Sequence, residues 1–342
     1  MIGRVVVLDN ILGQAAAALV VDGQLEELLI DPADDTPLPG AIYRAVAARP
    51  MKGQGGMFVK LPAGSGFLRQ TDGIAPGQRV IVQVTGPAEP GKALPVSTRL
   101  LFKSRLAIVT PGAPGLNISR RIKDEDLRGQ LESLAAEGMA GSDMGLILRS
   151  ACALAEAVEI AEDITAMRDL AEAVTSDLDG GPELLVEGAG AHETAWRDWA
   201  EPAPDEVIEA GFVAQGVLEM ITDLRQPRVA LVGGGNMMVE VTRALTAIDV
   251  NTGPDTSPAA SLKVNIAAAR ELPRQLRLRG LGGQIVVDFA PMPKKERAIL
   301  DQVIRAAFKT EAAETNLAGW TTLGLFEATR KRDRWPLGEL LP

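Results

Sequence analysis

The chain contains one cysteine, Cys152, and one histidine, His192, among 342 residues. A disulfide framework needs several cysteines, and a zinc site of the usual kind needs several Cys or His ligands, so the sequence excludes both. A catalytic relay built on histidine is excluded as well, unless His192 is its base. The near absence of cysteine is typical of a protein kept in a reducing compartment.

Long apolar runs and an excess of positive charge are also missing. The longest apolar run, AAAALVV, is far shorter than the roughly 18 residues that a membrane span needs, and MIGRVVVLD is too short for a signal peptide. We therefore expect a soluble cytoplasmic protein. Acidic residues number 45 against 35 Lys and Arg, a net charge of −10. This balance excludes a generally basic coat for nucleic acid and leaves only local basic patches.

What the chain does contain is typical of a globular protein. Hydrophobic residues make up 46% and charged residues 23%, which excludes wholesale disorder. The length predicts about two domains' worth of chain, at roughly 100–200 residues per domain. Residues 1–31 predict a hairpin or meander with a turn at Asp22-Gly23. Between about 40 and 101, short strand-like runs alternate with Gly and Pro clusters, which predicts a small all-β barrel.

The remainder is mixed. Residues 122–177 predict helices around a buried strand in GLILRSAC, and PELLVE in the following stretch predicts another strand. From 205 onward the pattern is α/β. It begins with an amphipathic helix over 205–226 and a hairpin at Gly233-Gly234-Gly235, and then alternates between helices and strands.

Two aspartates end predicted strands in the last third of the chain. They are Asp249 in ALTAIDVN and Asp288 in GGQIVVDFA, and Asn251 lies two residues after Asp249 on the same face. A helix between the two strands predicts a crossover that makes the strands neighbours. Such an oxygen-rich cluster suits Mg²⁺, which binds through one or two carboxylates, waters and phosphate oxygens. The alternative is that each aspartate caps the helix or turn that follows; for the two together we favour the metal site.

Longer motifs are more specific than this chemistry. ALTAIDVNTG, LKVNIAAARELPRQLRLRGLGGQIVVDF and NISRRI resemble the ribonuclease E/G family of bacterial endoribonucleases, most closely through about residues 240–290. The resemblance implies an α+β and α/β fold of several subdomains. These are a ribonuclease-H-like portion (1–36 plus 178–224), an inserted OB-type RNA-binding barrel (37–100), a 5′-sensor-like segment (101–177), a DNase-I-like catalytic α/β portion (225–335) and a tail (336–342).

The resemblance also implies a catalytic mechanism. In the family, the two motif aspartates hold one catalytic Mg²⁺, and the asparagine positions the first aspartate and the scissile phosphate. These residues correspond to Asp249, Asp288 and Asn251 here, with Mn²⁺ as an alternative metal and no zinc expected. The implied reaction is metal-assisted hydrolysis of single-stranded RNA, in RNA processing or decay, leaving 5′-phosphate and 3′-hydroxyl ends.

A second reading is a catalytically inactive RNA-binding scaffold protein. It is motivated by Pro291, which stands where the family usually has a second acid, and by the missing Cys-x-x-Cys zinc link of the family. Retention of all three catalytic-type residues argues against this reading. Without the zinc link we expect a monomer or weak dimer rather than a zinc-linked tetramer.

RNA-contacting positions follow from the same resemblance. In the barrel these are Phe58, Phe67 and Lys92, which suits single-stranded RNA because bases stack on aromatic faces while cations follow the backbone. The alternative is that the two phenylalanines belong to the core of the barrel. Arg149 and Ser150 correspond to a pocket that grips a 5′-terminal phosphate. The alternative there is an arginine ion-paired beside a buried strand.

Several clusters of basic residues fit a path for RNA. The alternative is that they balance the many acidic residues on solvated faces. The clusters are Arg120 and Arg121; Arg274, Arg277 and Arg279; Lys294, Lys295 and Arg297; and Arg330, Lys331, Arg332 and Arg334.

Overall fold

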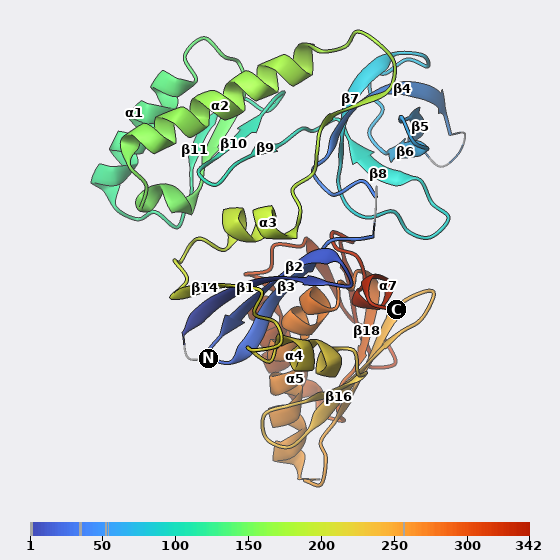
Figure 1. Ribbon diagram of the computed structural model, residues 1–342. Coiled ribbons are helices and arrows are strands. Elements are labelled where there is room, and N and C mark those ends of the chain that lie inside the picture. Colours follow the sequence, from blue (N-terminus) through green and yellow to red (C-terminus); the bar gives the residue numbers. More distant parts are fainter. Residues whose placement is uncertain (1–2, 34–35, 52, 54, 256) are drawn as a thin grey trace.

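The computed structural model describes residues 3–33, 36–51, 53, 55–255 and 257–342. Residues 1, 2, 34 and 35 of the expected N-terminal portion, 52 and 54 of the expected barrel, and 256 of the expected catalytic portion therefore lie outside the described residues. Four β-sheets organise the described chain. The barrel and a sheet with two long helices form the upper half of Figure 1, and the other two sheets form the lower half, with helix α3 between the halves.

The N-terminal sheet has the strand order β14-β1-β2-β3. Its strands are β1 (Arg4–Ile11), β2 (Gln14–Val21), β3 (Gln24–Ile30) and β14 (Glu206–Glu209). The predicted turn at Asp22-Gly23 is confirmed, and both residues have the positive φ that a tight hairpin requires. Strand β2 is apolar on both faces because both are covered: α4 (Val217–Leu224) packs on one and α3 (Ala191–Asp198) on the other.

Two expectations for this region are wrong. The helix predicted over 205–226 is instead β14, which pairs in parallel with β1, followed by the short helix α4. The segment 336–342, expected to be a tail, contains α7 (Leu337–Leu340), and Leu337 and Leu341 are buried in the core of the N-terminal sheet. The end of the described chain therefore packs against its beginning.

A five-stranded barrel follows the N-terminal sheet. Its strands are β4 (Ile42–Pro50), β5 (Met57–Lys60), β6 (Ser65–Leu68), β7 (Arg79–Val84) and β8 (Leu94–Ser97). The order β4-β5-β6-β8-β7 closes because β7 also pairs with β4, which confirms the predicted barrel and fits an OB-type domain. Strand β13 (Glu183–Val186) adds to β4, and buried Arg44 on β4 pairs with Asp177 and Glu183 beside it.

A small middle sheet and two helices form the next unit. The strands are β9 (Phe102–Lys103), β10 (Ala107–Thr110), β11 (Leu116–Ile118) and β12 (Gly145–Leu148), followed by the 3-10 turn η1 (Ser150–Ala153). The helices α1 (Glu125–Gly138) and α2 (Ala157–Ser176) pack on this sheet. Strand β12 is the buried strand predicted in GLILRSAC.

The C-terminal sheet has six strands in the order β15-β16-β17-β18-β20-β19. They are β15 (Arg228–Ala230), β16 (Asn236–Val241), β17 (Thr246–Asn251), β18 (Gly283–Asp288), β19 (Thr315–Trp320) and β20 (Phe326–Arg330). The hairpin predicted at Gly233-Gly234-Gly235 joins β15 to β16. Helices α5 (Pro258–Leu278) and α6 (Lys294–Phe308) contribute to one core with this sheet.

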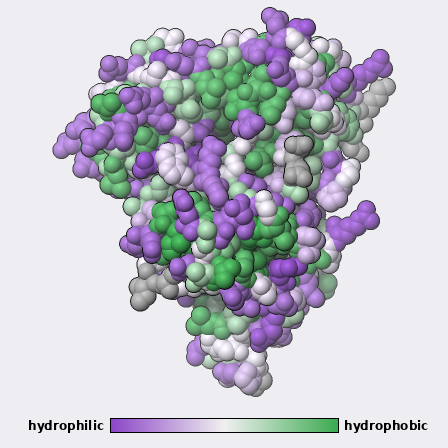
Figure 2. Space-filling model, viewed as in Figure 1, coloured by the Kyte–Doolittle hydropathy of each residue, from purple (hydrophilic) through white to green (hydrophobic). Residues whose placement is uncertain are grey.

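The buried apolar residues fall into separate clusters rather than one continuous core. The face seen in Figure 2 accordingly shows apolar patches in its upper and middle parts, separated by polar and charged side chains. Within the described part of the chain, no helix has the length and apolar character needed to cross a membrane.

Candidate active site at the ends of two parallel strands

The two predicted aspartates lie side by side. Strands β17 and β18 pair in parallel, and Asp249 and Asp288 are direct partners in the register. Helix α5 is the connection between these strands, as the sequence predicts. Both aspartates stand at the carboxyl ends of their strands, which is where open α/β sheets bind their ligands.

Alternation along the strands explains the exposure of these side chains. In β17, Ile248 and Val250 are buried in the core, whereas Asp249 and Asn251 are exposed on the opposite face. Asp288 is exposed on the same edge. The aspartates are therefore not enclosed by the sheet, and a ligand can approach both from solvent.

Asn251 orients the first aspartate. Its Nδ2 donates a hydrogen bond of 2.7 Å to Oδ2 of Asp249. The two-residue spacing makes this contact, because residues i and i+2 of a strand share a face. The amide thus fixes one carboxylate oxygen.

A buried asparagine that sequence reasoning missed fixes the loop behind Asp288. Asn265 lies on α5 and is fully buried. Its Nδ2 donates to the carbonyl oxygen of Ala290 at 2.9 Å, and its Oδ1 accepts from the amide of Ala290 at 2.9 Å. The signal in the sequence is a polar residue at an apolar position of the helical pattern in LKVNIAAAR, but its partner could not be read from that pattern.

The surface beside these residues is hollowed. An open pocket of about 610 Å³ adjoins Asn251; it is lined by Val250, Asn251, Thr252, Ser261, Ala290, Pro291, Met292 and Pro293. Its floor is partly the loop that Asn265 holds. The pocket therefore borders the two aspartates through Asn251 and the loop after Asp288.

The donors at this edge fit a hard divalent cation. They are two exposed carboxylates on adjacent strands and one amide, with no nitrogen or sulfur ligand, which is the chemistry that Mg²⁺ prefers. Across residues 3–33, 36–51, 53, 55–255 and 257–342, no group of three or more His, Cys, Asp or Glu residues could hold a metal. A metal at Asp249 and Asp288 would therefore keep several water or phosphate ligands, as Mg²⁺ sites usually do.

The predicted RNA-contacting phenylalanines lie outside the barrel core. Phe58 on β5 and Phe67 on β6 are register partners, with ring centroids 5.6 Å apart in an edge-to-face arrangement. Phe58 is 39% exposed, whereas its neighbours Met57 and Val59 are fully buried. The alternative reading of core residues is therefore wrong for Phe58. Lys92, in the loop before β8, is exposed and pairs with Glu89 at 2.9 Å.

Arg149 is already engaged by the protein. Its Nη2 lies 2.6 Å from Oδ1 of Asp198, and its Nη1 donates to the carbonyl oxygen of Ser104 at 2.7 Å. Burial raises the pKa of Asp198, but hydrogen bonds and ion pairs with Arg197 and Arg149 outweigh it and lower that pKa. Ser150 follows as the first residue of η1 and is half-buried. The ion-paired alternative describes the arrangement of Arg149 in this structure.

The sequence was also compared with known protein families and known proteins. The model of the ribonuclease E/G family matches residues 102–211 and 208–333. The chain belongs to the ribonuclease E/G family. It is 28% identical to ribonuclease E of Nostoc sp. over 95% of this chain and 55% of that protein, and 30% identical to ribonuclease E of Synechocystis sp. over 80% and 47%. It is 25% identical to ribonuclease G of Escherichia coli over 96% of this chain and 80% of that protein.

The chain spans about half the length of the two ribonuclease E relatives that it matches. The family match includes β17, α5 and β18, and therefore Asp249, Asn251 and Asp288. The barrel lies before the matched ranges, although the relatives align over nearly the whole chain.

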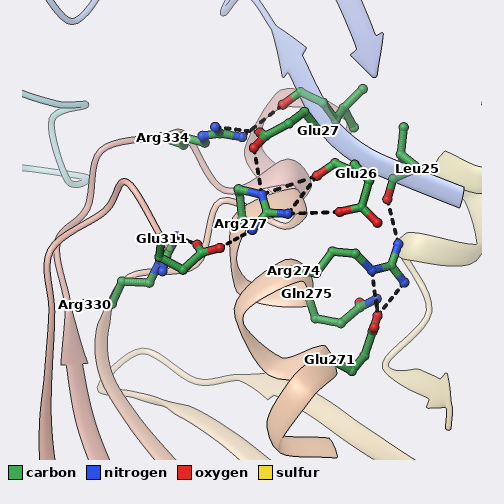
Figure 3. A network of polar contacts seen from close by, with 11 residues as sticks. Leu25, Glu26, Glu27, Glu271, Arg274, Gln275, Arg277, Glu311, Arg330 and Arg334 are labelled. Carbon is green, nitrogen blue, oxygen red and sulfur yellow. Dashed lines mark hydrogen bonds and ion pairs between the residues drawn. The ribbon is translucent and has the colours of Figure 1, made fainter. Parts of the chain in front are cut away.

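In this ribonuclease E/G family member, some of the predicted basic residues are ion-paired within the protein and others are exposed. Arg274, Arg277, Arg330 and Arg334 form partly buried ion pairs and therefore do not lie on a solvated face. Arg279 has no ion pair with any described residue, and Lys331 and Arg332 are exposed. Arg277 pairs with Glu26, Glu27 and Glu311, and these contacts join α5 to β3, as Figure 3 shows. The further members of this network are Arg274 with Glu271, Arg330 with Glu311, and Arg334 with Glu27.

Other basic residues remain exposed beside the strand ends. Lys294 and Lys295 begin α6, directly after the loop that follows Asp288, and neither forms an ion pair with any described residue. Arg297, one turn further, lies over the ring of Trp320 at 4.9 Å. Of the predicted clusters near the candidate active site, the two lysines therefore remain available to phosphates.

Proposed function

We propose that the protein is a Mg²⁺-dependent endoribonuclease that hydrolyses single-stranded RNA, in RNA processing or decay. The observation that carries the proposal is the register pairing of Asp249 with Asp288, with Asn251 hydrogen-bonded to the first carboxylate. Membership in the ribonuclease E/G family and relatives named ribonuclease E and ribonuclease G support it. The proposal includes the expected division into a ribonuclease-H-like portion, an OB-type barrel, a 5′-sensor-like segment and a DNase-I-like portion.

Asp249 and Asp288 would hold the Mg²⁺ ion. When bound, Mg²⁺ supplies an activated water for in-line attack on the phosphodiester and offsets the charge that develops on phosphate oxygens. Asn251 keeps the carboxylate of Asp249 in place, so that the site is formed before RNA arrives. The products expected are a 5′-phosphate and a 3′-hydroxyl end.

The RNA would be bound at a distance from the reacting phosphate as well. Phe58 is exposed and its edge-to-face partner Phe67 is half-buried, so the Phe58 ring offers a face on which a base can stack. Lys92, on the same barrel, is an exposed cation. Lys294 and Lys295 are placed to attract the backbone next to Asp288. We further propose a monomer or weak dimer.

The decisive test uses an end-labelled, A/U-rich single-stranded RNA with Mg²⁺. We expect Asp249→Asn and Asp288→Asn each to reduce cleavage more than roughly 100-fold, because direct metal ligands matter more than the outer partners whose loss costs 10–100-fold. Asn251→Ala removes such an outer partner, so we expect it to reduce cleavage by roughly 10–100-fold. Glu240→Gln is the matched control, because Glu240 is an exposed acid on the same face of the neighbouring strand β16.

RNA binding is measured in the same variants. Tight binding with loss of cleavage only in Asp249→Asn and Asp288→Asn supports the nuclease. Tight binding of the unmodified chain without any cleavage would favour the inactive scaffold. Undiminished cleavage in both aspartate variants would refute the assigned site.

The 5′-phosphate pocket is a separate part of the proposal. A terminal phosphate would have to compete with Asp198 for Arg149, because that carboxylate lies 2.6 Å from the guanidinium. We therefore expect little difference between 5′-phosphate and 5′-hydroxyl RNA in the unmodified chain, and a preference for 5′-phosphate RNA in Asp198→Asn. Equal cleavage of both RNAs by Asp198→Asn would contradict a role for Arg149 and Ser150 in binding the 5′ end.

A further inference from the structure

A second pocket lies far from the candidate active site. It has a volume of about 290 Å³ and forms where the β2–β3 turn, α4, β15 and the last turns of α5 meet. Its lining residues with charged side chains are Asp223, Arg228, Arg274 and Arg279. Much of the remaining lining is apolar, from Leu25, Met220, Leu224, Val229 and Leu278.

One of these arginines is buried without a counter-charge. Arg279 is only 8% exposed. Its Nε donates a hydrogen bond of 3.0 Å to Oε1 of Gln275. Its two terminal amino groups have no hydrogen-bond or ion-pair partner among the described residues. The neighbouring Arg274 and Arg277, by contrast, are neutralised by carboxylates.

The electrostatics agree with this geometry. Burial alone lowers the pKa of Arg279 to about 10, and no acidic residue raises it. Asp223 lines the same pocket but is exposed and forms no ion pair with Arg279. A buried, uncompensated cation costs stability, and proteins ordinarily pair such a charge. Among the described residues, no carboxylate pairs with the Arg279 guanidinium.

We propose that this pocket binds a small oxyanion that carries an apolar body, such as a phosphate monoester. The free amino groups of Arg279 form a planar fork that suits two oxygens of a phosphate or carboxylate. The exposed cation of Arg228 at the pocket wall attracts the same group. The volume of about 290 Å³ is just below the roughly 300–1,000 Å³ of small-molecule sites, so the pocket has room for a small ligand with a body of about one ring.

The site is distinct from the strand ends that carry Asp249 and Asp288. Helix α5 begins beyond β17 and runs for 21 residues, and the pocket is at its last turns. At a rise of about 1.5 Å per residue, roughly 30 Å separate the two ends of this helix. The proposal does not rest on nuclease activity, and its test uses no RNA cleavage.

The first experiment is isothermal titration calorimetry of the full chain with phenyl phosphate and with inorganic phosphate. We expect saturable binding of both, tighter for phenyl phosphate because its ring covers the apolar lining. Arg279→Met should lose roughly tenfold or more of the affinity, the loss expected when hydrogen bonds between charged groups are removed. Arg225→Met is the matched control: Arg225 is exposed at the end of α4 and outside the lining, so affinity should be unchanged.

The Tm of Arg279→Met without ligand is a second, independent test of the proposal. Arg279→Met should raise Tm, because it replaces an uncompensated buried charge by an apolar side chain of similar length. An arginine that served only the fold would show the opposite, a lowered Tm. Arg228→Met supplies a second variant at an exposed position, and a several-fold loss of phenyl phosphate affinity is expected there.

Three outcomes would overturn the proposal. They are no saturable binding of either anion to the unmodified chain, equal affinity in Arg279→Met, and a lowered Tm of that variant. If Arg279→Met instead weakens the binding of single-stranded RNA while phenyl phosphate does not bind the unmodified chain, the arginine contacts the RNA backbone and the small-molecule site is wrong.

Discussion

The contact between α5 and β3 gives the sharpest stability prediction. Arg277 is 15% exposed at its side chain and touches three carboxylates, those of Glu26, Glu27 and Glu311, as well as the carbonyl oxygen of Glu26 at 3.0 Å (Figure 3). The change to test is Arg277→Met, which keeps the length and apolar stem of the side chain but removes its charge. It leaves carboxylates behind in a partly buried place.

The expected loss of unfolding free energy depends on which ion-pair partners each carboxylate keeps in Arg277→Met. Removing one partner of a buried ion pair costs about 3–5 kcal/mol. Two of the three acids retain another arginine (Glu27 with Arg334, Glu311 with Arg330). Glu26 loses its direct ion pair and keeps only the more distant charge of Arg274. We therefore expect the lower end of the range, about 3 kcal/mol of unfolding free energy at pH 7.

The pH dependence has a definite sign. Burial raises the pKa of Glu26, and the charges of Arg274 and Arg277 oppose this rise. A carboxyl whose pKa is raised by folding stabilises the fold below its unfolded pKa, and this contribution is lost as the pH rises through the folded pKa. Without Arg277 the folded pKa of Glu26 rises further. The variant should therefore lose most at pH 7 and clearly less near pH 4, where Glu26 is protonated.

The assay is urea denaturation followed by tryptophan fluorescence at pH 4, 5.5 and 7. Arg305→Met is the control, because Arg305 is exposed on α6 and its pair with Asp301 is a helix surface contact that should contribute about 0.5 kcal/mol or less. A loss below about 1 kcal/mol at pH 7, or one that does not vary with pH, would show that the network contributes little and refute the reasoning.

Three further predictions follow from single contacts. Phe58→Ala should weaken single-stranded RNA binding roughly tenfold with little change in Tm, since the ring is 39% exposed; fluorescence anisotropy measures the first. Burial raises the pKa of Cys152 to about 11, so the thiol should resist iodoacetamide at pH 8 and react only in urea, as mass spectrometry would show. Gly280→Ala should lower Tm by several degrees in a thermal melt, because φ is +63° and a Cβ would overlap the carbonyl oxygen of Trp335.

The sequence predicted those elements that depend on residues close together in the chain. The Asp22-Gly23 turn, the hairpin at Gly233-Gly234-Gly235 and the barrel were all readable, because turn residues and alternation act within a few positions. The pairing of β17 with β18 was also readable, since a strand, a helix and a second strand allow few arrangements. The aspartates at both strand ends followed from it.

The error over 205–226 has a physical reason. Glu206–Glu209 is a strand of four residues, of which none is fully buried, and its pattern is compatible with a helix. It is a strand because β1, about 200 residues earlier, offers it a parallel partner, with Val5 opposite Glu206. A partner so distant in sequence leaves no mark on the local pattern.

The ion pairs of the arginines on α5 could not be predicted, for a related reason. A run such as RQLRLR shows how many charges it holds but not which acids lie against them. The acids that neutralise Arg277 come from β3 and from Glu311, far away on both sides in the sequence. Arg279, two residues further, finds none. The same motif therefore contains one arginine that stabilises the fold and another that is left for a ligand.

Helix α5 contacts both the candidate active site and the N-terminal sheet. Its first half holds Ala290 through Asn265, and so fixes the loop that directly follows Asp288. Its second half is bound to β3 through Arg274 and Arg277. A loosening of the second half that shifts the helix must also move Asn265, because a helix transmits displacement along its axis. In the proposed nuclease, Arg277→Met should therefore lower cleavage as well as stability. Arg305→Met, on the neighbouring helix, should leave cleavage unchanged and cost about 0.5 kcal/mol of stability or less.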